Sequence, residues 1–137
     1  YDNKDVVSKP DWTKLNNVIE VIKKSRVIVL CADYQKNQSP IIGKTEIENL
    51  FGRYFINTSR GELVDEDILL KFAQKNKFAG IALDVITNEN SENKLREWQK
   101  LAGIKNIIIT PHIGGITKES LKKTELYIVK KLKIALT

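Results

Sequence analysis

Two patterns of apolar residues alternate along this chain. The first is the i, i+3, i+4, i+7 spacing of an amphipathic helix, which occurs at Leu15, Val18, Ile19 and Ile22. By the same criterion, later helices are predicted over about 44–51, 66–76 and 92–101, and a long one after residue 117. The second pattern is a short continuous apolar run, which is typical of a strand and stands between these helices.

Side chains at the starts of two helices support these boundaries. Asp65 and Thr117 each precede a helix, where a side-chain oxygen can accept a backbone N–H and cap the first turn. Glu66 and Asp67 are interpreted as acids that favour the positive N-terminal end of the helix. The last helix carries an apolar stripe made of Leu121, Ile128, Leu132 and Ala135.

The continuous apolar runs predict four strands. Residues 27–32 form the clearest run, which is expected to be covered on both faces of the sheet. Cys31 lies inside this run and is interpreted as a buried small apolar residue, not as a nucleophile. The other runs are 54–58, 78–85 and 107–109. Because strands alternate with helices, the chain is predicted to form an α/β fold with a parallel sheet and right-handed crossovers.

Composition narrows the class of protein further. At 137 residues with 42% apolar residues, the chain is predicted to form one globular domain. Its net charge of +6 comes mainly from scattered lysines, so no nucleic-acid partner is expected. No apolar run approaches the roughly 18 residues of a membrane-spanning helix, so no membrane partner is expected either. The single cysteine cannot form an internal disulfide, which is consistent with a cytoplasmic protein.

Three chemically suitable residues each follow a predicted strand. Arg60 follows the second strand, Glu89 the third and His112 the fourth, at the end of the sheet where open α/β folds bind ligands. An arginine can pair with a substrate carboxylate through two hydrogen bonds, and a histidine can exchange a proton near neutral pH. A carboxylate bonded to the second ring nitrogen would stabilise the imidazolium and fix the ring.

Each of the three also has an ordinary structural interpretation. Alone, Arg60 would be read as a surface ion-pair partner, Glu89 as a solvated acid and His112 as a structural histidine beside a proline. Because all three occur together, in this order along the chain and each after a strand, a shared catalytic site is favoured over three separate structural roles. The two tryptophans, Trp12 and Trp98, are interpreted as packing residues on helix faces.

Longer motifs surround all three residues. They are Asn-Thr-Ser-Arg-Gly at 57–61, Ala-Gly-Ile-Ala-Leu-Asp-Val at 79–85 with Glu89 beyond, and Thr-Pro-His-Ile-Gly-Gly at 110–115. Together these motifs resemble the D-isomer-specific 2-hydroxyacid dehydrogenases, the phosphoglycerate dehydrogenase-like family. The resemblance implies a Rossmann-like doubly wound parallel sheet that is truncated at its N-terminal side.

The resemblance also implies roles for individual residues. Arg60 would orient the substrate, and Glu89 with His112 would form the proton relay. Asp84 would lie against the carboxamide of the nicotinamide. Arg60 and His112 would also contact the cofactor. The remaining cofactor contacts would come from Cys31, Ala32, Thr58, Ser59, Gly114 and Gly115.

The nature of the cofactor is indicated by Asp2. Tyr1-Asp2 resembles the end of the second Rossmann strand of this family, where an aspartate binds the adenosine ribose and favours NAD over NADP. Alternatively, Asp2 is an ordinary residue near the end of the chain with no role in cofactor binding. Cys31-Ala32-Asp33 and Asn90 replace segments in which the family commonly has a proline.

The resemblance covers the chain but not a whole enzyme. Residues 1–137 contain no G-x-G-x-x-G loop for the dinucleotide pyrophosphate and no separate substrate domain. Because the chain lacks methionine and begins with Tyr1, it is expected to belong to a longer protein. We therefore expect residues 1–137 to be a partial NAD-binding domain, inactive alone, and the intact protein to be a homodimer.

The predicted function of the intact protein is NAD-dependent oxidation and reduction. It would interconvert a 2-keto acid and a D-2-hydroxy acid, but the sequence does not indicate which acid. An alternative is a regulatory or protein-interaction module that binds NAD(H) without turnover, as some proteins with this fold do. A structural α/β domain with chance motifs is the remaining alternative.

Overall fold

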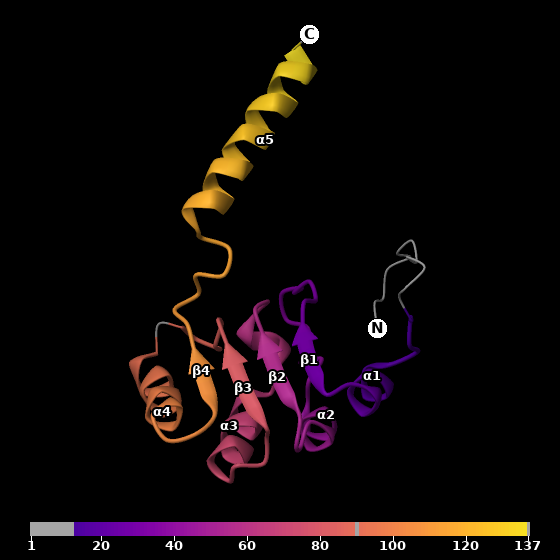
Figure 1. Ribbon diagram of the computed structural model, residues 1–137, viewed down its shortest axis with the longest axis vertical. Helices are drawn as coiled ribbons and strands as arrows, with labels where there is room; N and C mark the ends of the chain where they lie inside the picture. Colours follow the sequence, from indigo (N-terminus) through magenta and orange to yellow (C-terminus); the bar gives the residue numbers. More distant parts are fainter. Residues whose placement is uncertain (1–12, 90, 137) are drawn as a thin grey trace.

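The computed structural model describes residues 13–89 and 91–136, and one parallel sheet forms its centre (Figure 1). The strands follow the order of the sequence across the sheet: β1 (Val27–Leu30), β2 (Tyr54–Asn57), β3 (Gly80–Leu83) and β4 (Ile107–Ile109). Five helices accompany them: α1 (Val18–Lys24), α2 (Lys44–Asn49), α3 (Glu66–Gln74), α4 (Glu92–Ala102) and α5 (Lys118–Leu136). A short 3-10 turn covers Gly61–Leu63. The predicted α/β Rossmann-like class is confirmed.

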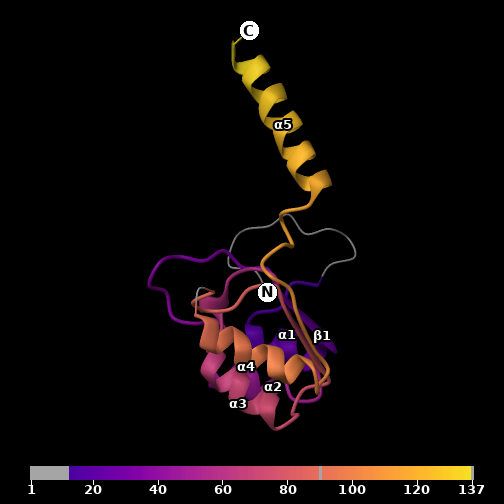
Figure 2. The same ribbon diagram turned by 90° about the vertical axis from the view of Figure 1, so that its left-hand side faces the viewer.

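Helices α2, α3 and α4 connect successive strands and lie on one face of the sheet (Figure 2). The strand order explains this arrangement. Each crossover moves to the next strand in the same direction, and crossovers between parallel strands are right-handed, so each helix returns on the same side. The core between sheet and helices is apolar, and its largest fully buried side chains are Trp98 and Phe55.

The opposite face of the sheet is open. Along β1, residues alternate between exposed and buried, and Val29 retains 52% of its surface. Ile108 on β4 retains 62%. A shallow groove of about 390 Å³ runs over this face, lined mostly by apolar residues that include Val27, Ile56 and Ala82. The prediction that residues 27–32 are covered on both faces is therefore wrong for the described chain.

Cys31 also differs from its prediction, because it is exposed. β1 ends at Leu30, whose side chain is buried, and successive side chains of an extended chain point to opposite sides. Cys31 therefore continues the exposed series of Val27 and Val29. A continuous apolar run does not by itself distinguish a strand covered on both faces from one covered on a single face.

Predicted helix caps are confirmed at two positions. The Asp65 carboxylate accepts the Ile68 N–H at 3.2 Å at the start of α3. The Thr117 hydroxyl accepts the Ser120 N–H at 3.0 Å at the start of α5. A further polar contact joins two helix ends. The Arg53 guanidinium donates to carbonyls at the ends of α1 and α2, where a cation is favourable.

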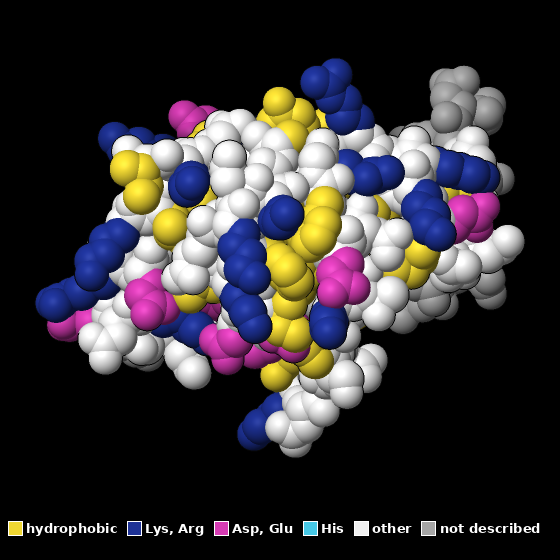
Figure 3. Space-filling model, turned by 90° about the horizontal axis from the view of Figure 1, so that it is seen from below, with side chains coloured by type: hydrophobic (Ala, Val, Ile, Leu, Met, Phe, Trp, Pro, Cys, Tyr) yellow, Lys and Arg dark blue, Asp and Glu magenta, His cyan; other side chains and the backbone are white. Residues whose placement is uncertain are grey.

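Helix α5 extends away from the sheet (Figure 1), and its side chains from 121 to 134 are all exposed. The described helices include none with the length and apolar character needed to cross a bilayer. At the amino ends of the strands, lysine and arginine side chains are interspersed with acidic and apolar ones (Figure 3). A basic stripe is therefore not evident on this face.

We predict that the 137-residue chain associates with itself in solution. Its open sheet face is apolar, and in the sheet formed by residues 13–89 and 91–136 β1 lies at an edge, where the backbone of another strand can pair. Ile108→Lys should weaken association by placing a charge on that face, as measured by sedimentation velocity over a range of concentrations. The control is Ile104→Lys, because Ile104 is 75% exposed but lies between α4 and β4, outside the sheet. A chain that is monomeric at every concentration would contradict the prediction.

Candidate active site

The three candidate residues Arg60, Glu89 and His112 lie in the loops that follow β2, β3 and β4. The last residues of the strands, Leu30, Asn57, Leu83 and Ile109, are paired across the sheet. All four loops consequently leave the sheet at one edge, which is the upper edge in Figure 1. Ligands of open α/β sheets bind at this carboxyl-terminal edge.

Glu89 and His112 contact each other directly. The His112 Nδ1 atom lies 2.8 Å from Glu89 Oε1 and 2.9 Å from Glu89 Oε2. Both side chains are 43% exposed. Solvent therefore weakens the electrostatic attraction between them, and the imidazole ring stays accessible to a ligand. Because a carboxylate only accepts hydrogen bonds, Nδ1 is the donor. The second ring nitrogen, Nε2, is then left for another partner.

The backbone is unusual at both ends of this contact. Asn88, which precedes Glu89, has a φ of 52°, and His112 itself also has a φ of 52°. Residues other than glycine seldom adopt this left-handed region, and those that do cluster at functional sites. The His112 N–H donates to the Asp84 carbonyl at 2.9 Å, which helps to hold this conformation.

The Asp84 side chain organises the loop that carries His112. Its Oδ1 atom accepts hydrogen bonds from the Thr110 hydroxyl and, at 3.0 Å, from the Ile113 N–H. Its Oδ2 atom accepts the Gly114 N–H at 2.8 Å. A Cβ atom on Gly114 would lie 2.9 Å from Oδ2, so glycine permits this close approach. Asp84 and Gly114, both predicted cofactor contacts, thus lie side by side.

Two opposing effects act on the pKa of Asp84. Burial on its own raises this pKa, because it disfavours the charged form. Hydrogen bonds from Thr110, Gly114 and Ile113 outweigh burial, and the positive charge of protonated His112 adds to their effect. The pKa of Asp84 is therefore held below its usual value of 3.8.

The loop that carries Arg60 is held by Asn57, the last residue of β2. Its buried side chain donates from Nδ2 to the Arg60 carbonyl at 3.0 Å and accepts the Ser59 N–H at 3.0 Å. The Ser59 hydroxyl donates to the Ala32 carbonyl in the loop after β1. Ser59 and Ala32, both predicted near the cofactor, are therefore brought together across neighbouring strands.

Arg60 is exposed, and the structure does not bring it against Glu89 or His112. Its Nη1 atom donates to the Ser59 carbonyl at 2.6 Å. Across residues 13–89 and 91–136, its guanidinium has no ion-pair partner. An exposed guanidinium at this edge of the sheet can pair with a carboxylate ligand.

Gly61 brings the Arg60 loop against the Glu89 loop. A Cβ atom at this buried position would lie 2.2 Å from the Ile86 carbonyl carbon and 2.3 Å from the Thr87 nitrogen. No side chain fits there unless the backbone moves. The glycine after Arg60 thus lets the two loops pack together, backbone against backbone.

The remaining predicted positions differ in what the structure describes. Thr58 and Gly115 are exposed at the edge that carries the site, as is Cys31. Asp2, predicted to contact the ribose, lies outside the described residues, and so do Trp12 and Asn90. Trp98 is fully buried, as expected for a packing residue.

Glu66 is a polar residue whose structural role was not predicted from the sequence. Its place at the start of α3 predicts an acid that favours the helix N-terminus, but its carboxylate is buried and accepts the Thr87 N–H and the Trp98 Nε1–H. A buried tryptophan does predict an acceptor for its ring N–H. It does not predict which residue supplies that acceptor, because Glu66 and Trp98 are 32 positions apart.

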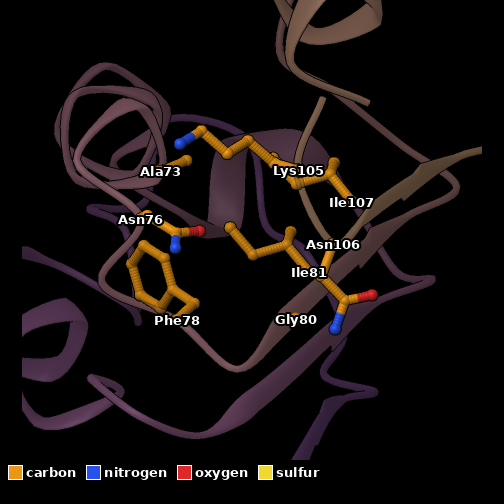
Figure 4. A pocket seen from close by; sticks show the side chains of 8 residues that line it. All are labelled: Ala73, Asn76, Phe78, Gly80, Ile81, Lys105, Asn106 and Ile107. Carbon is orange, nitrogen blue, oxygen red and sulfur yellow. The ribbon is translucent and has the colours of Figure 1, made fainter. Parts of the chain in front are cut away.

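A second concave region lies at the other end of the sheet (Figure 4). It is a cavity of about 10 Å³ beside the amino ends of β3 and β4, lined by Asn76, Gly80, Lys105 and their neighbours. It has room for about one water molecule. It is separate from the Glu89–His112 contact, and it is too small for an organic substrate.

Comparison with known proteins agrees with the resemblance seen in the sequence. The family "D-isomer specific 2-hydroxyacid dehydrogenase, NAD binding domain" matches residues 1–114. D-3-phosphoglycerate dehydrogenase 1 of Saccharomyces cerevisiae is 31% identical over an alignment of 129 residues, and the match covers 88% of this chain and 28% of the yeast protein. An aromatic 2-oxoacid reductase of Clostridium sporogenes is 32% identical over an alignment of 131 residues, and the match covers 88% of this chain and 40% of the reductase.

Solved structures show the same relationship. The crystal structure of D-lactate dehydrogenase from Aquifex aeolicus, complexed with NAD and lactic acid, superimposes with a TM-score of 0.78 at 33% identity. The match covers 96% of this chain and 44% of that enzyme. The chain thus spans less than half the length of these three relatives, and the resemblance inferred from the motifs is confirmed.

We predict that Asp84 makes the stability of the chain depend on acid pH. A lowered pKa stabilises the folded state above pH 4, and this contribution is lost as the pH falls through the folded-state pKa. Asp84→Asn should cost about 1–3 kcal/mol at neutral pH, because the amide group must face a backbone N–H. Urea denaturation at several pH values should show this difference shrinking below about pH 4.

The control for this experiment is Asp67→Asn. Asp67 is largely exposed and pairs with Lys94 at the surface, so its replacement should have a small effect at all pH values. A stability difference for Asp84→Asn that is the same at pH values well below and well above 4 would contradict the prediction.

Proposed function

Because this chain belongs to the D-isomer specific 2-hydroxyacid dehydrogenases, as part of their NAD-binding domain, we propose that its protein interconverts a 2-keto acid and a D-2-hydroxy acid with NAD(H). The observation that carries this proposal is the contact of Glu89 with His112 Nδ1 at the carboxyl-terminal edge of the sheet. Oxidoreductases of this class need a proton donor beside the carbonyl, and this pair supplies one.

His112 is the proposed general acid and base. Glu89 accepts the hydrogen bond from Nδ1, so it orients the ring and stabilises the imidazolium. Nε2 then gives its proton to the ketone oxygen during reduction and takes it back from the hydroxyl during oxidation. The unusual backbone angle of His112 and its anchoring to Asp84 support a fixed position for this nitrogen.

Arg60 is the proposed substrate-binding cation. Its planar guanidinium can form two parallel hydrogen bonds with the carboxylate that every 2-keto acid carries. The bonds from Asn57 to the backbone of residues 59 and 60 would hold Arg60 in place before the substrate arrives. Pairing with the carboxylate would direct the neighbouring ketone toward His112.

The exposed edge of the site suits the nicotinamide end of the cofactor. Gly114 and Gly115 have no side chains, so a flat ring can approach their backbone, and Thr58, Ser59, Cys31 and Ala32 border the same edge. When bound, NAD(H) would supply or accept the hydride. We propose NAD over NADP, because the matched family is an NAD-binding domain and Asp2 suits a ribose contact.

The proposal concerns the whole protein, because the relatives are more than twice as long as this chain. Residues 1–137 contain no G-x-G-x-x-G loop to bind the pyrophosphate. We therefore propose that these residues do not turn over substrate alone. The choice of 2-hydroxy acid depends on contacts beyond those described here.

We predict that His112→Asn lowers kcat of the intact protein about 10²–10⁴-fold, because the general acid is lost. NADH oxidation should be followed at 340 nm in the presence of glyoxylate, hydroxypyruvate, phosphohydroxypyruvate and longer 2-keto acids. The matched control is Glu97→Gln, an exposed position within α4, outside the three loops that carry the site. If no 2-keto acid is reduced by the unmodified protein, while NADH binds, a regulatory NAD(H)-binding protein becomes the better explanation.

We predict a different effect for Arg60→Lys. Lysine keeps the charge but cannot form the two parallel hydrogen bonds, so kcat/KM for the 2-keto acid should fall roughly 10–100-fold. The affinity for NADH, measured by its fluorescence, should change little. Unchanged kcat/KM would exclude Arg60 as the carboxylate-binding residue.

A further inference from the structure

Three polar or charged side chains are buried among the described residues: Asn57, Glu66 and Asp84, with 1%, 5% and 8% of their surfaces exposed. Two of them hold loops of the candidate site. Asn57 binds the backbone of the loop with Arg60, and Asp84 binds the backbone of the loop with His112. Glu66 has no part in the proposed chemistry, yet buried carboxylates are rare and need partners.

The partners of Glu66 lie beside the third loop. One carboxylate oxygen accepts the backbone N–H of Thr87, two residues before Glu89. The other accepts the ring N–H of Trp98 on α4 at 2.8 Å. Between Thr87 and Glu89 the chain turns at Asn88, whose carbonyl accepts the Ser91 N–H at 2.7 Å. The position of Thr87 therefore sets the point from which Glu89 extends.

Thr87 is also where two loops of the site meet. Gly61, directly after Arg60, packs against the Ile86–Thr87 peptide, so a shift of Thr87 would disturb both loops. Glu66 lies five residues after Gly61 at the first position of α3, which is a rigid element. Its side chain therefore connects the start of α3, and Trp98 on α4, to the backbone of the loop that carries Glu89.

We propose that Glu66 is a positioning residue that holds Glu89 against His112. In this role it determines which nitrogen of the neutral imidazole carries hydrogen, because Glu89 favours hydrogen on Nδ1 and leaves Nε2 toward the substrate. The inference deepens the proposed function and rests on it for the role of His112. The positioning itself is measurable without turnover.

Only a carboxylate satisfies this site. Thr87 and Trp98 both present N–H donors, and a carboxylate offers an acceptor to each. Glutamine has the same shape but offers one oxygen and one NH2 group, so one donor must face another donor. Removing the Trp98 N–H should relieve this conflict and let the glutamine oxygen bind Thr87 again.

The test therefore compares Glu66→Gln, Trp98→Phe and the double variant in the 137-residue chain. His112 is its only histidine, so the ring-nitrogen shifts in 15N NMR report the hydrogen position without assignment ambiguity. We expect the ratio of the Nδ1–H to the Nε2–H form to fall about tenfold in Glu66→Gln, as loss of one hydrogen bond implies. Trp98→Phe should lower stability but keep the ratio, and the double variant should restore it.

Glu89→Gln is the reference variant, because it tests the Glu89–His112 contact of the proposed function separately from the positioning role of Glu66. If Glu89→Gln changes the ratio but Glu66→Gln does not, Glu66 does not position Glu89, and the proposed function is unaffected. If neither changes it, the Glu89–His112 contact does not control the imidazole, which overturns this inference and removes the main support for the proposed function. If the single variant Trp98→Phe also lowers the ratio, the change reflects packing in general, and the positioning role of Glu66 would be overturned.

Glu66→Asp keeps the test decisive if Glu66→Gln does not fold. Aspartate retains both acceptor oxygens but withdraws them by one methylene group from Thr87. The expected result is a lowered ratio of Nδ1–H to Nε2–H in the folded variant. An unchanged ratio in Glu66→Asp would overturn the proposal.

Discussion

The structure depends on one constraint, the in-register pairing of four parallel strands. Pairing aligns Leu30, Asn57, Leu83 and Ile109, so the loops after all four strands begin at the same edge. Arg60 and His112, which are 52 positions apart in sequence, consequently lie at the same edge of the sheet, on either side of the loop after β3 that carries Glu89. Because the crossovers are right-handed and advance in one direction, the helices cover only one face. The same constraint thus creates both the site and the open apolar face.

The alignment of the strand ends brings the loops to one edge, but it does not hold them in place. Buried polar side chains hold them. Asn57, Glu66 and Asp84 each satisfy backbone N–H or carbonyl groups of a different loop, and each lies inside the protein, where an unpaired polar group would be costly. A loop that moved away would leave such a group unsatisfied. Moving a loop would therefore cost free energy by leaving a buried polar group unpaired, and this coupling fits the proposed role of His112 as a fixed proton donor.

Close backbone approaches complete this arrangement. Gly61 lets the Arg60 loop rest on the Ile86–Thr87 peptide, and Gly114 lets the His112 loop approach the Asp84 carboxylate. Neither glycine adopts a left-handed conformation. Among the described residues other than glycine, Asn37, Asn76, Asn88 and His112 adopt it. The glycines thus serve packing, and two of these four unusual backbone angles lie at or beside the residues of the proposed relay.

The sequence alone determined the number and order of the elements, the caps at Asp65 and Thr117 and the family, because these follow from local spacing and contiguous motifs. It also indicated Arg60, Glu89 and His112, since each follows a strand. Only the tertiary structure decided that the face of Val29 is open, that Cys31 is exposed and that Glu66 is buried. An apolar run does not record which faces the helices cover, and the partner of Glu66 on α4 lies 32 residues away. Such contacts depend on strand order and crossover handedness, which arise only when the whole sheet assembles.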